Sequence, residues 1–179
     1  MVQAVVWDLG GTLIHHPPGG QDRDPLDTYE GIGLRSGVEL ALKAVAQAGC
    51  RQAVLSNTAV SDSNSVQRLL TRLGVAKFFS VIVATQSELD ADRPGKPDRV
   101  VFQQVLEELN VMPEEAVMVG NSWDHDVVGA LRAGLYAFWI TNPDVSMGRP
   151  SKEQIAMPRV TPIFDIQEVG VALGRLGAC

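Results

Sequence analysis

The chain has 179 residues, of which 45% are hydrophobic and 20% are charged. It can therefore bury one sizeable core but is too short for two large domains. Its net charge of −6 and its scattered basic residues argue against a protein that binds nucleic acid or a membrane surface. Cys50 and Cys179 make no disulfide framework, and the first apolar run is too short to span a bilayer. We expect a single cytoplasmic domain over residues 1–179.

Apolar runs of strand character alternate along the chain with apolar stripes at helical spacing. We expect strands over residues 4–7, 52–55, 80–84, 116–119 and 136–140. Helices are expected over residues 38–48, 66–73, 102–109 and 127–133, and a last helix follows the cap at residues 165–168. The connections are long enough for crossovers, which predicts an α/β fold with a doubly wound, parallel, five-stranded sheet.

Turn-forming residues and caps set the ends of these elements. Ser36 and Glu39 have the spacing of a capping box, so we expect Ser36 to begin the first helix. Residues 15–25 are rich in proline and glycine and predict an irregular loop, where Asp22 should face solvent. Residues 141–163 contain four prolines and no clear periodicity, so no strand is predicted there.

Polar residues follow the predicted strands at their carboxyl ends. They are Asp8 after the first strand, Ser56, Asn57 and Thr58 after the second, Lys96 in a loop between prolines, and Asn121, Asp124 and Asp126 after the fourth. An aspartate before a glycine turn is by itself as consistent with a turn cap as with catalysis. Because the carboxyl ends of parallel strands share one edge of the sheet, however, we expect all these side chains to converge on one crevice.

Four segments of the chain resemble, in order, the four motifs of the haloacid dehalogenase superfamily. They are Asp8-Leu9-Gly10-Gly11-Thr12-Leu13, then Leu55-Ser56-Asn57, then Gly95-Lys96-Pro97-Asp98, and finally residues 119–126 followed by residues 129–134. Four ordered motifs at the ends of the right elements are far more specific than any one of them. The resemblance implies a sheet of order 5-4-1-2-3, with the strands before Asp8 and Asp126 side by side.

The resemblance also implies a phosphatase mechanism that uses Mg²⁺. Asp8 would attack the phosphorus atom and form an aspartyl-phosphate that water then hydrolyses. The metal would be held by Asp8, the backbone carbonyl of Gly10, Asn121 and Asp126, with Asp124 as a further carboxylate within reach. The expected substrate is a small phosphorylated metabolite.

The phosphoryl oxygens need positive charge and hydrogen-bond donors around them. By the same resemblance, Lys96 would neutralise charge, while Ser56 and backbone amides near Gly11 and Asn57 would hold the oxygens. The gaps after the first and third strands are too short for a large cap domain. We expect an open site, unless the segment after Thr141 or a second subunit of a homo-oligomer covers it; an open site would also admit a phosphoprotein.

Two positions depart from the common phosphatase pattern. Gly10 stands where a second aspartate usually acts as general acid and base, a role that contributes about 10²–10⁴-fold in rate. Asn121 stands where a metal-binding aspartate is usual, which predicts weaker Mg²⁺ binding. Three roles are consistent with His15 and His16: substitute general acids, zinc ligands or solvated loop residues.

Two other functions remain open at this point. The dehalogenase members of the superfamily also lack the second aspartate and carry an Asn-x-Trp-Asp run, as residues 121–124 do here. In that reaction Asp8 would attack carbon without a metal, although no segment is long enough for the helical cap that those enzymes have. The second is a non-catalytic protein that binds a phosphorylated ligand.

Trp123 would pack at the edge of the crevice or stack on a substrate ring.

Overall fold

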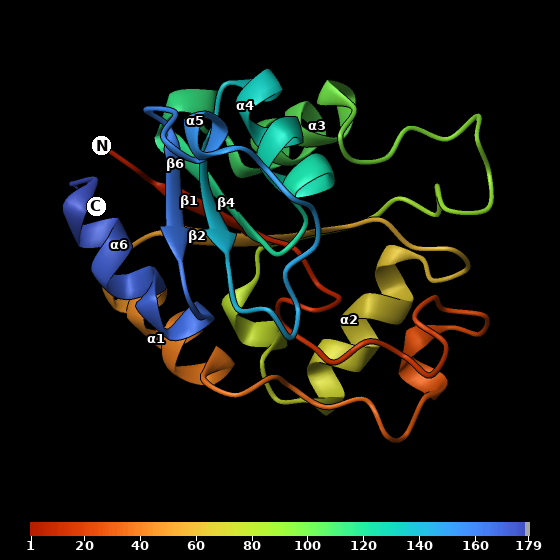
Figure 1. The fold of residues 1–179 in the computed structure, drawn as a ribbon. Helices are drawn as coiled ribbons and strands as arrows, with labels where there is room; N and C mark the ends of the chain where they lie inside the picture. Colours follow the sequence, from red (N-terminus) through yellow and green to blue (C-terminus); the bar gives the residue numbers. More distant parts are fainter. Residues whose placement is uncertain (178–179) are drawn as a thin grey trace.

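The computed structural model describes residues 1–177, and Cys179 lies outside this range. Within it, parallel strands form one sheet with helices on both faces (Figure 1). In order across the sheet, the strands are β3 (Val81–Ala84), β2 (Arg51–Ser56), β1 (Ala4–Trp7), β4 (Ala116–Gly120), β5 (Tyr136–Ile140) and β6 (Val160–Ile163). The α/β class and the expected order of the first five strands are confirmed.

The sixth strand shows that the prediction of a five-stranded sheet is wrong by one strand. β6 lies at the edge of the sheet and pairs only with β5 in the described range, with Pro162 beside Trp139. Proline lacks the amide hydrogen that a central strand needs, but an edge strand has one side without a neighbour. Its short, proline-containing sequence shows no alternation of apolar and polar residues, which is why the pattern gave no strand.

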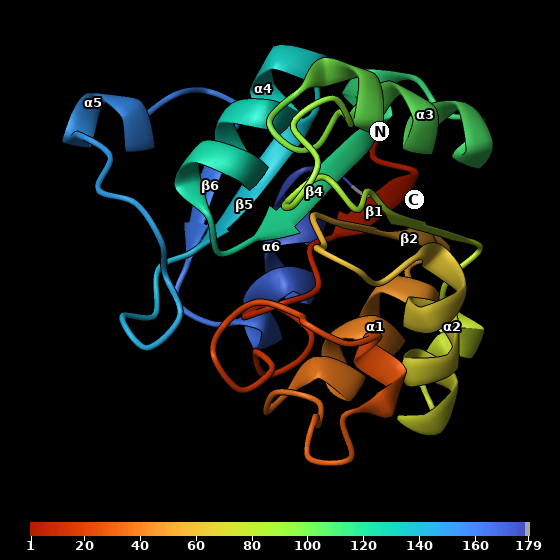
Figure 2. The same ribbon diagram turned by 90° about the vertical axis from the view of Figure 1, so that its right-hand side faces the viewer.

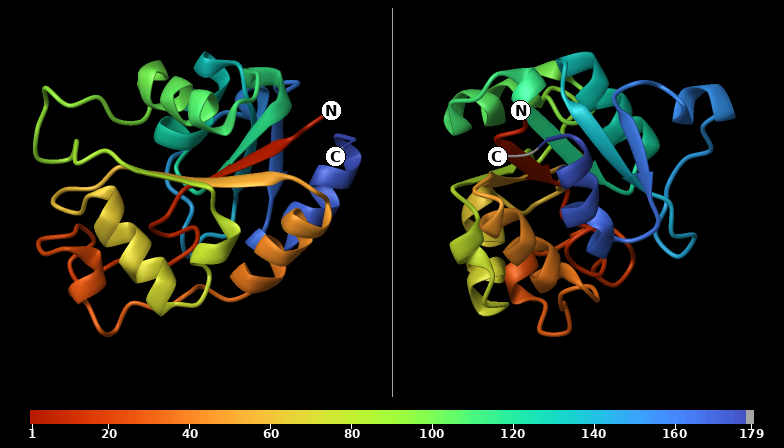
Figure 3. Two further views of the ribbon diagram at one scale, coloured as in Figure 1. Left: turned by 180° about the vertical axis from the view of Figure 1, so that it is seen from behind. Right: turned by 90° about the vertical axis from the view of Figure 1, so that its left-hand side faces the viewer.

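Helices cover both faces of the sheet (Figures 2 and 3). The longer elements are α1 (Val38–Gln47), α2 (Ser63–Arg72) and α6 (Val169–Arg175) on one face, and α3 (Arg99–Leu109) and α4 (Gly129–Ala133) on the other. Shorter turns are η1 (Leu26–Thr28), η2 (Ala76–Phe78), η3 (Pro113–Glu115), α5 (Lys152–Ile155) and η5 (Ile166–Glu168). Among the described residues, no helix has both the length and the apolar character required to cross a membrane.

Strand β1 is buried on both sides, as expected for a central strand of a parallel sheet. Val5 and Trp7 pack against the face that carries α1, and Ala4 and Val6 pack against the face that carries α3. In register, Trp7 lies beside Val54 of β2 and Val119 of β4. The residues that follow these three strands are therefore neighbours at one edge of the sheet.

The start of α1 differs from the predicted capping box. The cap position belongs to Gly37, which has a φ of 80° and makes no side-chain cap, so the role expected of Ser36 is wrong. A left-handed conformation strains residues that have a Cβ atom. A Cβ at Gly37 would also collide with the Gln167 side chain. Glycine therefore solves a local packing problem that the sequence pattern could not reveal.

Asp22 is buried rather than solvated, which corrects the expectation for the loop after Leu13. The residue is 5% exposed, and its carboxylate accepts hydrogen bonds of 2.7, 3.2 and 2.7 Å from the successive amides of residues 59–61. Three backbone donors satisfy a buried carboxylate and tie this loop to the one that follows β2. Both loops flank the carboxyl edge of the sheet, so this contact holds the wall of the crevice in place.

Removing that anchor should destabilise the protein. Asp22→Ala leaves buried amide donors without an acceptor, so we expect the free energy of unfolding to fall by about 2–4 kcal/mol. Urea denaturation followed by circular dichroism measures the change. The matched control is Asp24→Ala, on an exposed residue of the same loop, which should unfold like the wild type. Equal midpoints for both variants would contradict the anchoring role of Asp22.

Candidate functional site

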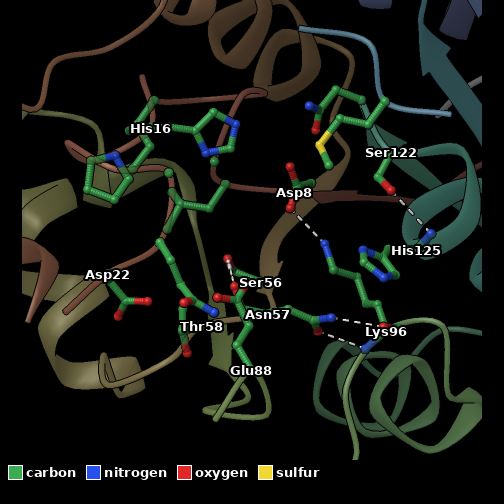
Figure 4. A pocket seen from close by; sticks show the side chains of 18 of the residues that line it. Asp8, His16, Asp22, Ser56, Asn57, Thr58, Glu88, Lys96, Ser122 and His125 are labelled. Atoms are coloured by element: carbon green, nitrogen blue, oxygen red, sulfur yellow. Dashed lines mark hydrogen bonds and ion pairs between the residues drawn. The ribbon is translucent and has the colours of Figure 1, made fainter.

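A pocket of about 180 Å³ opens at the carboxyl ends of β1, β2 and β4 (Figure 4). Most of the predicted site residues line it, namely Asp8, Gly10, Ser56, Asn57, Lys96, Asn121 and Asp126. The other two predicted residues do not line the pocket: Gly11 is buried, and Asp124 is exposed. The tertiary structure thus brings together side chains from four separate segments, as the sequence predicted.

Lys96 bridges two buried carboxylates in this pocket. Its Nζ lies 2.7 Å from Asp8 Oδ1 and 2.7 Å from Asp126 Oδ1. The side chains of Lys96 and Asp126 are 2% and 1% exposed, whereas that of Asp8 is 10% exposed. Asp126 belongs to η4 (Trp123–Val128), a π-helical turn after β4, and its Oδ2 accepts a 2.9 Å hydrogen bond from the Ser122 amide. Asp8 is thus the less enclosed of the two carboxylates.

The pKa values of Lys96 and Asp126 depend on burial and on the charges that surround each group. Burial by itself would lower the pKa of Lys96, but Asp126 and Asp8 outweigh it and raise that pKa above its usual value. Burial raises the pKa of Asp126 to about 6, and the nearby Asp8 adds to this, while Lys96 opposes it. Lys96 is therefore a fixed positive charge beside Asp8 at neutral pH.

Asn57 positions the loop that carries Lys96. Its Nδ2 donates to the Lys96 carbonyl at 2.8 Å, and its Oδ1 accepts from the Lys96 amide at 2.7 Å. The Lys96–Pro97 peptide bond is cis. The carboxamide of Asn57 is therefore already engaged with the loop, and its backbone amide is the group left to face a ligand. Ser56 Oγ donates to the Asn57 carbonyl at 3.2 Å, and this hydroxyl can rotate toward the pocket.

Backbone amides at the start of the first loop are suited to hold an anion. Among the described residues, no acceptor pairs with the amides of Leu9 and Gly10, which line the pocket beside Asp8. The Gly11 amide, by contrast, donates to the Ile14 carbonyl at 2.9 Å. The anion-binding role expected near Gly11 is thus better matched by Leu9 and Gly10. Unpaired backbone amides at such a position can form an anion site without any charged side chain.

Oxygen atoms gather on the other side of Asp8, where Mg²⁺ was expected. Thr12 Oγ1 donates to Asp8 Oδ2 at 2.8 Å and lies 3.3 Å from Asn121 Oδ1. Asn121 Nδ2 donates to the Val145 carbonyl at 2.7 Å, which turns its Oδ1 toward Asp8. The Gly10 carbonyl accepts from no donor in the described range. Mg²⁺ prefers oxygen ligands, and the oxygen atoms near Asp8 are of the types that it binds. No cluster of three acidic, histidine or cysteine side chains occurs within residues 1–177.

Several residues that line the pocket were not predicted as site residues from the sequence, and Met147 and His125 are two of them. Met147 comes from the segment after β5, where its amide donates to the Asn121 carbonyl and its carbonyl accepts from the Trp123 amide, both at 2.8 Å. The segment after Thr141 thus forms one wall of the pocket. His125 lines the pocket from η4. Of the two histidines in the first loop, His16 lines the pocket and His15 does not. Periodicity carries no signal for such loop residues.

Trp123 belongs to the core. Its ring packs edge-to-face against Trp139 with centroids 5.2 Å apart, and it is 3% exposed. The packing interpretation is therefore confirmed, and Trp123 does not line the pocket.

Replacing Lys96 should leave two buried carboxylates without a cation. We expect Lys96→Met to lower the free energy of unfolding by about 3–5 kcal/mol, because an unpaired buried charge is strongly destabilising. The matched control is Lys43→Met, since Lys43 forms an i,i+4 ion pair with Glu39 on the surface. Urea unfolding curves compare the two variants. A Lys96→Met protein as stable as its control would show that the buried bridge does not hold the site together.

Comparisons with known proteins agree with the geometry. Residues 21–134, more than half of the chain, match the family model described as haloacid dehalogenase-like hydrolase. The glyceraldehyde 3-phosphate phosphatase of Methanothermobacter thermautotrophicus is 33% identical over 100 residues, which are 56% of this chain and 42% of that protein. The phosphoserine phosphatase of Thermus thermophilus is 35% identical over 103 residues, which are 58% of this chain and 37% of that protein. The chain thus spans less than half the length of these curated relatives.

One solved structure matches along nearly the whole chain. It is an uncharacterized protein from Listeria monocytogenes serotype 4b, with 40% sequence identity and a TM-score of 0.93. The match covers 98% of this chain and 99% of that one. Together with the family-model match and the pocket around Asp8, this similarity leads to one conclusion. The chain belongs to the haloacid dehalogenase-like hydrolase family.

Proposed function

We propose that the protein is a Mg²⁺-dependent phosphomonoesterase that acts on a small phosphorylated metabolite through an aspartyl-phosphate on Asp8. The observation that carries the proposal is the Asp8 carboxylate, held 2.7 Å from Lys96 in a pocket that also presents unpaired backbone amides. A carboxylate, a fixed cation and amide donors are what transfer of a phosphoryl group to an enzyme nucleophile requires. The two phosphatases named above support a phosphorylated substrate.

In the proposed reaction, an oxygen of Asp8 attacks the phosphorus atom as the bond to the leaving oxygen breaks. Lys96 offsets the charge of Asp8 and of the phosphoryl group, which otherwise repel each other. The amides of Leu9 and Gly10 donate to the phosphoryl oxygens as charge accumulates on them. Water then attacks the phosphorus of the aspartyl-phosphate, which releases inorganic phosphate and restores the Asp8 carboxylate.

Mg²⁺ would be held by Asp8, the Gly10 carbonyl and Asn121 Oδ1, and would neutralise the phosphoryl group and help to orient it. Asp126, also expected as a ligand, has a side chain that is 1% exposed, against 10% for Asp8, and this deeper burial beside Lys96 favours a supporting role. One carboxylate and two neutral oxygens bind a divalent cation less strongly than two or three carboxylates.

The size of the pocket favours a small substrate. Its volume of about 180 Å³ lies below the roughly 300–1,000 Å³ of ordinary ligand sites, so it suits a phosphoryl group and a few further atoms. The loop that contains Asp22 and the segment that contains Met147 both contribute to its lining. The described fold therefore supports one hydrolase domain with walls made of loops and without a large cap.

The first experiment is hydrolysis of p-nitrophenyl phosphate with Mg²⁺ and with EDTA. We expect metal-dependent activity in the wild type and a loss of at least about 10³-fold in Asp8→Asn, because the carboxamide is a poor nucleophile. Circular dichroism verifies that the variant is folded. Undiminished activity of Asp8→Asn would contradict the proposed nucleophile.

The same protein samples also test the two other functions. Halide released from a 2-haloacid in EDTA, without phosphatase activity, would identify a dehalogenase. Binding of inorganic phosphate without turnover of either substrate would identify a ligand-binding protein. Either result would overturn the proposed function.

A further inference from the structure

By the motif that residues 8–13 resemble, a general acid is expected at position 10, where this chain has glycine, and the structure places the ring of His16 beside that glycine. We infer that His16 is the general acid and base of this site. The inference rests on the proposed phosphohydrolase function. It assigns a catalytic role to a residue of the loop after Leu13, 6 positions beyond Gly10 in the sequence.

The imidazole of His16 lies over the two glycines of the first loop. A Cβ atom built on Gly10 would lie 3.1 Å from His16 Nδ1 and 3.2 Å from its Cε1. A Cβ atom on Gly11 would lie 2.8 Å from His16 Nε2. Apart from the chain neighbours of Gly10, no other atom of the described residues lies within 4 Å of the first position. The ring therefore fills the volume that a side chain at position 10 would use.

The backbone conformation at Gly10 does not demand glycine. Its φ lies outside the left-handed range, in contrast to the φ of 77° at Gly11. An ordinary side chain could adopt this backbone, and the nearest obstacle is the edge of the His16 ring. Because residue 10 is a glycine, the ring of His16 can lie beside it. A ring nitrogen of His16 is then close to the space that a side chain at position 10 would occupy.

The backbone on both sides of His16 is held in place, while the residue itself is exposed. The His15 amide donates to the Gly33 carbonyl at 3.1 Å, Ile14 forms a bridge with Leu34, and Pro17 is buried. Figure 4 draws the His16 side chain among those that line the pocket, together with Asp8. Within residues 1–177, neither ring nitrogen has a hydrogen-bond partner, so both are available to a ligand. Imidazole is the side-chain group that most often serves as a general acid or base.

Other titratable side chains of the pocket are less suitable. Asp22 accepts three backbone hydrogen bonds, and Lys96 and Asp126 are paired with each other. Glu88 and His125 line the pocket, but neither contributes an atom near the position of the missing side chain. Of these groups, His16 alone combines free ring nitrogens with the correct position.

Proton transfer by His16 balances both halves of the reaction. In the first half, Asp8 bonds to phosphorus, the ester P–O bond breaks, and protonated His16 gives its proton to the leaving oxygen. An alcohol leaves, and His16 becomes neutral. In the second half, neutral His16 takes a proton from the attacking water, the bond between phosphorus and Asp8 breaks, and phosphate leaves. His16 ends protonated, ready for the next turnover.

The leaving group distinguishes this role from a structural one. Nitrophenolate leaves without protonation, whereas an alkoxide requires a proton donor. His16→Asn should therefore lower kcat/KM for an alkyl phosphate such as glycerol 3-phosphate by about 10²-fold or more, and for p-nitrophenyl phosphate by less than about fivefold. A merely structural histidine would change both values by the same factor.

Two matched variants use the other histidines of the chain. His15→Asn alters the exposed neighbour outside the pocket, and both substrates should be hydrolysed as in the wild type. His125→Asn alters the other histidine of the pocket. If this variant, rather than His16→Asn, loses alkyl phosphatase activity selectively, the inference is overturned.

A position swap gives the sharpest test. In the His16→Asn background, Gly10→Asp places a carboxyl group in the space that the ring has left, and we expect it to restore alkyl phosphate hydrolysis at least tenfold. If folded His16→Asn keeps the wild-type ratio of alkyl to aryl phosphatase activity, the inference about His16 is overturned. The proposed function is not affected by that result, provided that the wild type is active and its activity depends on Asp8. Inactivity of the wild type toward both esters would instead contradict the proposed function itself.

Discussion

The buried bridge from Lys96 to Asp8 and Asp126 is the constraint on which the rest of the site depends. Two carboxylates with so little solvent contact repel each other and lose hydration, so they are compatible with folding only when a cation lies between them. Lys96 supplies that cation, and Asn57 holds its loop in position with two backbone hydrogen bonds. The arrangement holds a fixed positive charge beside Asp8 before any ligand arrives, and charge that is positioned in advance can stabilise a transition state.

Around this bridge, the functional groups occupy separate sides of Asp8. Unpaired amides of Leu9 and Gly10 face the pocket, while the oxygens of Thr12 and Asn121 gather near the other carboxylate oxygen. His16 covers the glycines of the first loop. The absence of a side chain at position 10 thus leaves space that a ring from further along the chain occupies.

The pocket walls are loops, and their placement depends on a few buried polar contacts. Asp22 binds the amides of residues 59–61, and Met147 pairs with the backbone on both sides of Ser122. Loops tied down in this way can define a small cavity without an added domain. This explains how a chain with short insertions encloses a site of about 180 Å³.

The sequence by itself determined the alternating elements, the parallel sheet and the residues that meet at its carboxyl edge, because periodicity and strand-end residues are local signals. It did not reveal β6, whose Pro162 is tolerated only at a sheet edge, nor the cap at Gly37, which depends on Gln167 from a distant turn. Only the tertiary structure decided that Asp22 is buried, that Met147 forms a wall and that His16 lies over Gly10. Those facts depend on contacts between residues far apart in the chain or on irregular loops, where no repeating pattern relates the side chain to its surroundings.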